Sequence, residues 1–217
     1  LCLSLIINIL SISTPGQIIS VLSKCFITFY VFLYPEDQRG GGCILDGEQT
    51  VATAQAESNG KAVLQVQIPN AKLWSPDSPA LYRCRAMFGD DCAETTFGVR
   101  TLSWGDDGFC STASGVILLG ACVHHDHRRS GGLLLPRSGG TQSPAAAKGS
   151  YNAVRCAHNP CSKAFLDACD RLGMLVMDEY ADMWYIHKTQ YDYAATCPTT
   201  GGRIWNPLSA RTTAIRQ

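Results

Sequence analysis

The feature that most constrains the fold is a helical pattern between two short strand-like runs, residues 151–155 and 174–177. The intervening segment places four apolar side chains on one helical face: Phe165, Leu166, Cys169 and Leu172. Ser162 can cap the start of this helix and Gly173 its end. The order strand, helix, strand predicts two parallel strands joined by a crossover helix, which is a βαβ unit.

Polar side chains follow each predicted strand of this region. A third apolar run, residues 115–123, ends in His124, residues 151–155 are followed by His158, and residues 174–177 by Asp178 and Glu179. Open α/β sheets and β/α barrels place their sites at the carboxyl ends of parallel strands. We therefore expect these side chains to meet on one face.

The preceding region, from about Gln49 to Trp104, has a different pattern. Residues 63–68 alternate between apolar and polar side chains, and residues 81–87 form a second strand-like run. Asn59-Gly60 is a hairpin turn signal, and the two prolines of residues 75–79 indicate a loop. This pattern predicts antiparallel strands in a small β-sandwich of immunoglobulin type.

Charge and cysteine content exclude several functions. The 18 basic and 18 acidic residues cancel, so nucleic-acid binding is not expected. The 11 cysteines form no C-x-x-C pair, which disfavours a zinc knuckle and, with the size of the chain, favours a reducing cytoplasm. No apolar stretch in residues 1–34 reaches the roughly 20 residues that span a bilayer, so a membrane segment is not expected.

Two segments allow more than one interpretation. The apolar residues 1–34 are either buried strands of a preceding domain or sequence outside the native reading frame. Residues 131–149, rich in glycine and proline, contain no amphipathic helix of the kind that a β/α barrel needs there. They are either a long irregular loop or the product of a damaged frame in residues 128–148.

Residues 152–160 read Asn-Ala-Val-Arg-Cys-Ala-His-Asn-Pro and are followed by an apolar pair, an acidic residue, a glycine and an apolar strand. This long pattern resembles the signature of glycoside hydrolase family 2, the family of β-galactosidases, with Asn159 where tyrosine is common. Residues 72–82, 97–100, 119–126 and 178–193 resemble neighbouring parts of the same family.

The resemblance implies a fold of two parts. It implies an immunoglobulin-like β-sandwich over residues 44–104 and the first part of a (β/α)8 TIM barrel over residues 105–217, with residues 1–43 unassigned. A whole barrel needs about 250 residues, so the barrel in this chain is expected to be incomplete.

The family also implies an activity. Its members cleave β-glycosides with retention, using one glutamate as acid/base and another as nucleophile. Both glutamates follow later barrel strands, and of the five glutamates here only Glu179 lies at a strand end. We expect a piece of an enzyme for terminal β-galactosides that is inactive by itself; β-glucuronidase, β-mannosidase and a non-catalytic carbohydrate-binding remnant are the alternatives.

The resemblance also implies roles for individual residues. Those expected to contact the sugar are His124, Asp126, His158, Asn159 and Trp184. Arg155 would support the nucleophile, together with Asp178 and Glu179; alternatively it forms a structural ion pair with one of these two. The histidines could instead be satisfied at the barrel rim, and Trp184 could be a core residue rather than a platform for the sugar ring.

No metal or cofactor is expected. The run His124-His125-Asp126-His127 cannot surround one ion, because neighbours on a strand point to opposite faces. Met183 and Tyr185 stand where the magnesium-dependent members of the family have an acidic residue and a histidine. Cys156, Cys161 and Cys169 are interpreted as small buried apolar residues. The expected partner is a β-galactoside or related oligosaccharide, and an oligomer is possible for the full-length protein.

Overall fold

The structure is a computed structural model. It describes residues 4–10, 25–32, 38–58, 61–88, 90–106, 108–112, 114–124, 151–179, 182, 186–192 and 194. These residues fall into two compact units, one ending at Val116 and the other beginning at Ile117. Each unit is described by itself.

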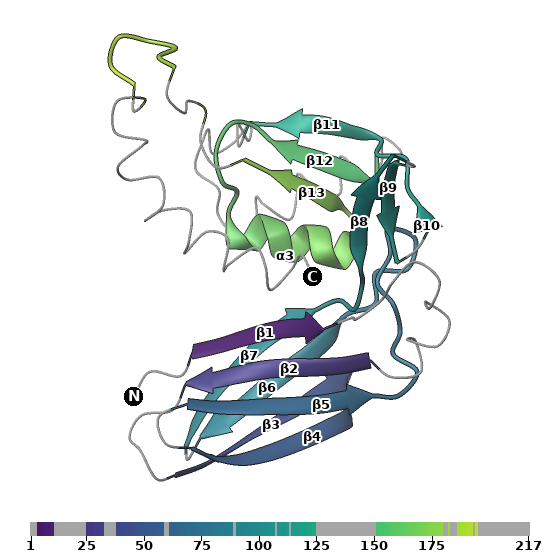
Figure 1. The fold of residues 1–217 in the computed structure, drawn as a ribbon, viewed down its shortest axis with the longest axis vertical. Helices are drawn as coiled ribbons and strands as arrows, with labels where there is room; N and C mark the ends of the chain where they lie inside the picture. Colours follow the sequence, from purple (N-terminus) through teal and green to yellow (C-terminus); the bar gives the residue numbers. More distant parts are fainter. Residues whose placement is uncertain are drawn as a thin grey trace. The chain divides into compact units, whose positions relative to one another are not determined.

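The first unit contains two antiparallel sheets that share a core (Figure 1). A four-stranded sheet has the order β4-β3-β6-β7, and its strands are β3 (Gln38–Asp46), β4 (Gln49–Ser58), β6 (Tyr82–Phe88) and β7 (Asp91–Phe97). A three-stranded sheet has the order β1-β2-β5, and its strands are β1 (Ser4–Leu10), β2 (Cys25–Phe32) and β5 (Lys61–Ile68). A small third sheet contains β8 (Leu102–Gly105), β9 (Gly108–Ser111) and β10 (Ser114–Gly115).

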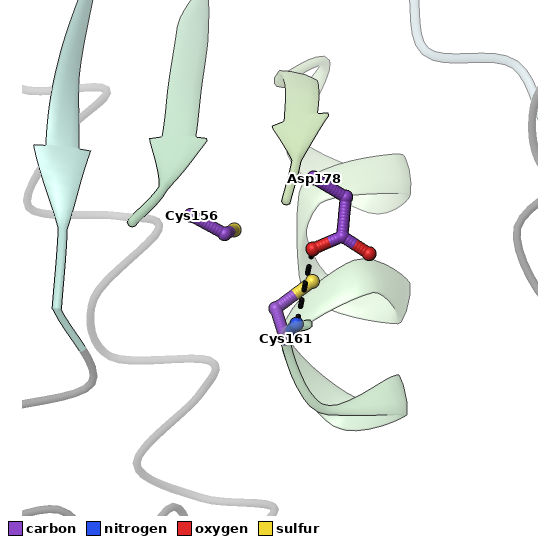
Figure 2. Close-up of side chains that lie close together, drawn as sticks. All are labelled: Cys156, Cys161 and Asp178. Atoms are coloured by element: carbon purple, nitrogen blue, oxygen red, sulfur yellow. Dashed lines mark hydrogen bonds between the residues drawn. The ribbon is translucent and has the colours of Figure 1, made fainter. Parts of the chain in front are cut away.

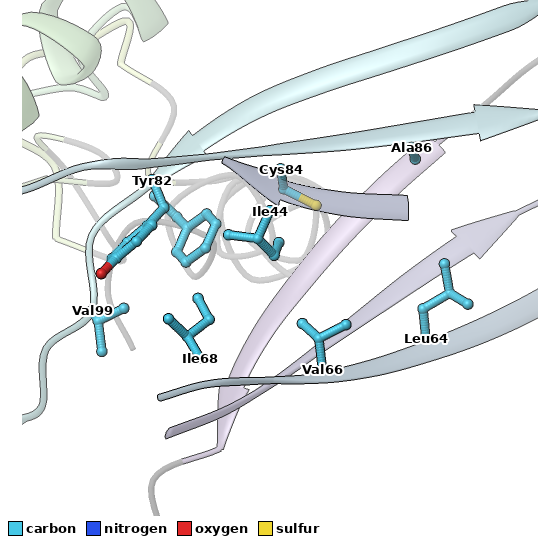
Figure 3. Packing of buried hydrophobic residues seen from close by; sticks show 9 residues of the cluster. Ile44, Leu64, Val66, Ile68, Tyr82, Cys84, Ala86 and Val99 are labelled. Carbon is cyan, nitrogen blue, oxygen red and sulfur yellow. The ribbon is translucent and has the colours of Figure 1, made fainter. Parts of the chain in front are cut away.

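The core of this unit confirms the alternation in the sequence. Leu64, Val66 and Ile68 of β5 are buried, whereas Gln65 and Gln67 between them are exposed. The buried side chains of β5 meet those of the other sheet, and Figure 3 shows this cluster: Ile44, Leu64, Val66, Ile68, Tyr82, Cys84, Ala86, Phe97 and Val99. Burial of this apolar surface is the main force that holds two sheets together.

The turns correct one prediction. Asn59-Gly60 lies outside the described residues, but the strands on either side of it, β4 and β5, belong to different sheets. The predicted hairpin between them is therefore wrong, because the chain crosses from one sheet to the other at this point. The tight hairpin instead joins β3 and β4, where Asp46 pairs with Gln49 and Gly47 adopts a φ of 62° that favours glycine.

The apolar N-terminal region contributes strands to the first unit. β1 pairs with β2, and β2 pairs with β5 from Cys25↔Ile68 to Phe32↔Lys61. Among the described residues, no helix is long and apolar enough to cross a membrane.

The second unit contains the predicted βαβ arrangement (Figure 1). Strands β11 (Gly120–Val123), β12 (Ala153–Cys156) and β13 (Leu175–Asp178) form a parallel sheet in that order. Helix α3 (Lys163–Leu172) connects β12 to β13 and has the predicted caps: the Ser162 hydroxyl accepts from the Phe165 amide, and Gly173 is left-handed.

Two apolar parts of this unit are more exposed than their apolar pattern alone would predict. Leu172 is 40% exposed although it shares the apolar stripe of the helix, because it lies in the last turn of α3. The run 115–123 is not one buried strand, since only residues 120–123 pair with β12. Ile117, Leu118 and Leu119 precede the paired residues and are 80%, 43% and 53% exposed.

Candidate active site at the carboxyl ends of the parallel strands

Three polar residues follow the three parallel strands. His124 comes directly after β11, Glu179 directly after β13, and His158 two residues after β12. Parallel strands bring their carboxyl ends to one edge of the sheet, and here the rings of His124 and His158 lie 5.6 Å apart between centroids, edge to face. The structure therefore brings these side chains together as the sequence predicts.

Glu179 is the centre of this cluster. The Arg155 guanidinium donates from Nε to Oε1 of Glu179, and Nδ1 of His158 lies 3.1 Å from Oε2. Both carboxylate oxygens are thus engaged, and the Glu179 side chain is only 19% exposed. Of the two ion pairs considered for Arg155, the structure contains the one with Glu179.

The electrostatics of the cluster keep Glu179 ionised. Partial burial alone would raise the pKa of this carboxyl, but the hydrogen bonds from Arg155 and His158 and their charges outweigh it and lower the pKa below its ordinary value. The same pairing raises the pKa of Arg155. A carboxylate only accepts hydrogen bonds, so His158 donates from Nδ1 and a neutral ring would accept from a ligand at Nε2.

Two further charged side chains, Asp182 and Lys188, lie near His158. Oδ1 of Asp182 lies 3.7 Å from its Nδ1, and Asp182 also accepts from the ammonium of Lys188. The hydrogen bond from Lys188 lowers the pKa of the Asp182 carboxyl. His158 therefore faces two carboxylates, each of which is also paired with a permanent cation.

The loop after Asp182 is organised by Asp192. Its carboxylate accepts from the backbone amides of Lys188 (2.6 Å), Thr189 (2.9 Å) and Ala194 (3.0 Å), and Nδ1 of His187 lies 2.8 Å from its Oδ1. These backbone bonds, first those of Thr189 and Ala194, lower the pKa of Asp192 to about 2. Asp182 and Asp192 were not predicted as site residues. The signal in the sequence was a pair of aspartates in a loop, a residue type that favours local bonds to the backbone.

Asn152 has a structural role in the same motif. Its Oδ1 accepts from the Leu119 amide (2.8 Å) and its Nδ2 donates to the Ile117 carbonyl (2.9 Å). The side chain thus binds the segment that precedes β11 to the start of β12. The asparagine of the motif aligns the strands whose ends carry His124 and His158.

The remaining predicted site residues have separate surroundings. Asp178 accepts from the Cys161 amide (3.1 Å), and Asn159 donates locally to the Pro160 carbonyl (3.2 Å). Asp126 and Trp184 lie outside the described residues, as do His125, His127, Met183 and Tyr185. The three cysteines of this region, Cys156, Cys161 and Cys169, are buried as predicted.

Comparison with known proteins decides the family. Residues 35–100 match the family described as glycosyl hydrolases family 2, and residues 116–197 match the glycosyl hydrolases family 2 TIM barrel domain. The chain belongs to glycosyl hydrolase family 2. Its resemblance to that family, stated from the motif alone, is confirmed.

Relatives in the family show the same match. A β-galactosidase of Bacteroides ovatus is 33% identical over 154 residues, which are 67% of this chain and 18% of that protein. A Formosa agariphila protein assigned as a β-glucuronidase is 33% identical over 159 residues, 70% of this chain and 15% of that protein. The chain thus spans less than a fifth of the length of these two relatives.

The chain is also similar to solved structures of the family. A family 2 glycosyl hydrolase from Bacteroides cellulosilyticus superposes with a TM-score of 0.84 at 26% identity. The match covers 97% of this family 2 chain and 28% of that one.

Proposed function

We propose that this chain is part of a retaining β-glycoside hydrolase that removes terminal β-galactosides. The β-galactosidase relative supports the substrate, and the polar cluster at the strand ends supports the place of binding. Under this proposal the first unit is an immunoglobulin-like sandwich, and the sheet β11-β12-β13 with α3 is the first part of a TIM barrel.

The observation that carries the proposal is the Glu179 cluster. Arg155 and His158 meet on Glu179 at the edge where β/α barrels bind substrate, and His124 lies against His158. In our proposal, His124 and His158 contact sugar hydroxyls together with Asp126, Asn159 and Trp184. Arg155 supports the charge of the site, aided by Asp178 and Glu179.

We further propose that the chain does not hydrolyse glycosides by itself. Retention requires two carboxyl groups about 5 Å apart, one of which must be protonated to act as an acid. Glu179 is the glutamate at a strand end, and its lowered pKa makes it a poor proton donor at neutral pH. The acid/base and the nucleophile are then not among these 217 residues.

A glucuronide-hydrolysing enzyme is the second candidate, because two of the relatives are assigned as β-glucuronidases. A glucuronide carries a carboxylate that needs a cation in the site. Arg155 and Lys188 are both engaged by carboxylates of the chain, which favours the neutral galactoside. For the whole protein, a cytoplasmic location and assembly into an oligomer are also proposals.

The experiment measures turnover and binding with the full chain. We expect no release of the aryl group from aryl β-galactoside or aryl β-glucuronide above the blank, and turnover would refute the proposed inactivity. Galactose binding, followed by ligand-observed NMR, should be lost in His158→Ala and retained in His187→Ala, a histidine outside the strand-end cluster. Preference for glucuronate over galactose would favour the second candidate, and binding of neither sugar would favour a non-catalytic remnant.

A further inference from the structure

A cluster of two thiols and a carboxylate lies next to the Glu179 cluster in the sequence, because Asp178 directly precedes Glu179. Cys156, Cys161 and Asp178 each offer a metal-ligating atom, and these three atoms all lie within 4.8 Å of one another. Cys156 is 0% and Cys161 6% exposed, and Figure 2 shows the three side chains gathered beside α3. Cys156 and Cys161 take no part in the proposed glycosidase chemistry or sugar binding.

The topology explains why these residues meet. Cys156 is the last residue of β12 and Asp178 the last residue of β13, and the two are direct partners in the parallel register. Cys161 precedes the Ser162 cap of α3, and its backbone amide donates to Oδ1 of Asp178 (3.1 Å). The ends of two paired strands and the residue before the cap of α3 therefore hold the three donors.

The donor set and spacing suit a borderline soft cation. Zinc binds thiolate sulfur at about 2.3 Å and carboxylate oxygen at about 2.0–2.2 Å in tetrahedral geometry, which places two sulfur ligands about 3.8 Å apart. Donors within 4.8 Å of one another reach that spacing with shifts of about 1 Å or less. Thiolates disfavour Mg²⁺ and Ca²⁺, which prefer sites made only of oxygen.

Charge must also be balanced in this buried place. The hydrogen bond with Cys156 and then burial raise the pKa of the Cys161 thiol, so without metal this thiol is protonated at neutral pH. Two thiolates, one carboxylate and Zn²⁺ together carry a net charge of −1. The amino end of α3, directly after Cys161, favours that negative charge.

We propose that Cys156, Cys161 and Asp178 form a zinc-binding site whose fourth position takes water or a further ligand. Zinc bound here fixes the segment from Cys156 to Cys161 against the end of β13. That segment contains His158, and Glu179 directly follows β13. The site is structural in this proposal, and it departs from the sequence-based expectation of no metal. It does not depend on the galactosidase assignment.

The test is a Co²⁺ titration of the full chain under reducing conditions, read by absorbance. We expect one tightly bound Co²⁺ with the near-ultraviolet band of thiolate-to-cobalt charge transfer, and displacement of this Co²⁺ by Zn²⁺. Loss of an outer-shell partner typically weakens metal binding 10–100-fold, so Cys161→Ala and Asp178→Asn, which remove direct ligands, should weaken it at least about 100-fold.

Cys169→Ala is the matched control, because Cys169 is equally buried in the same unit but outside the cluster. It should bind Co²⁺ as the parent does. Far-ultraviolet circular dichroism establishes that each variant is folded, and Zn²⁺ should raise the Tm of the parent and of Cys169→Ala but not of Cys161→Ala. The absence of a charge-transfer band in the parent, or parent-like binding by Cys161→Ala, would overturn the proposal whatever the outcome of the sugar assays.

Discussion

The Asn152 side chain is expected to hold residues 117–119, which precede β11, against the start of β12, and Asn152→Ala tests this. The substitution removes the bonds from the Leu119 amide and to the Ile117 carbonyl, at 2.8 Å and 2.9 Å. A hydrogen bond contributes about 0.5–1.5 kcal/mol net, and these two are exposed to water, so we expect a loss of about 1–2 kcal/mol in total. The backbone bonds of residue 152 to Leu119 and Leu175 do not involve its side chain and remain.

The measurement is amide hydrogen exchange at Leu119, because its amide donates directly to Asn152. A loss of about 1–2 kcal/mol predicts exchange about 5–30 times faster at this amide. Asn159→Ala is the control, since that side-chain amide donates locally to the Pro160 carbonyl. Unchanged exchange of Leu119 in Asn152→Ala, or equal acceleration in Asn159→Ala, would refute the reasoning.

Three further predictions concern stability. Ser162→Ala removes the N-cap of α3 and should lower the free energy of unfolding, measured with urea, by about 1 kcal/mol. An unchanged free energy of unfolding would contradict this role of the cap. Gly98→Ala places a Cβ 2.8 Å from Cβ of the buried Trp74 and should lower the free energy of unfolding by about 1–3 kcal/mol. Gly105→Ala is the control and should be nearly neutral, because the added Cβ meets no atom within 4 Å. Asp192 has a lowered folded-state pKa, so its contribution is present above pH 3.8 and is lost as the pH falls to about 2. Carboxyl titration by NMR checks this, and a midpoint near 3.8 would contradict it.

Local patterns predicted the elements of the second unit well. Helix α3 begins after Ser162 and ends before Gly173, because a hydroxyl cap and a left-handed glycine act within one turn of the chain. The burial of Leu64, Val66 and Ile68 follows from a side-chain period of two. The meeting of His124, His158 and Glu179 was also predictable, since it requires only that the strands be parallel and adjacent.

Some errors come from packing that the local pattern does not contain. Asn59-Gly60 has the composition of a hairpin turn, yet its flanking strands belong to different sheets, because β4 pairs with β3 whereas β5 pairs with β2. The apolar residues 117–119 are exposed. The local pattern did not predict this, because it does not show which part of an apolar run will pair with a neighbouring strand.

The sequence by itself determined the family, the βαβ order and the set of polar residues at the strand ends, because each depends on short-range pattern or on a long motif. Only the tertiary structure decided which carboxylate Arg155 binds. The register pairs Arg155 with Met177 and Cys156 with Asp178, so Asp178 joins the buried cysteines while Glu179 meets the arginine. A shift of one residue in that register would exchange the two faces, and register is set by contacts between strands that are distant in sequence.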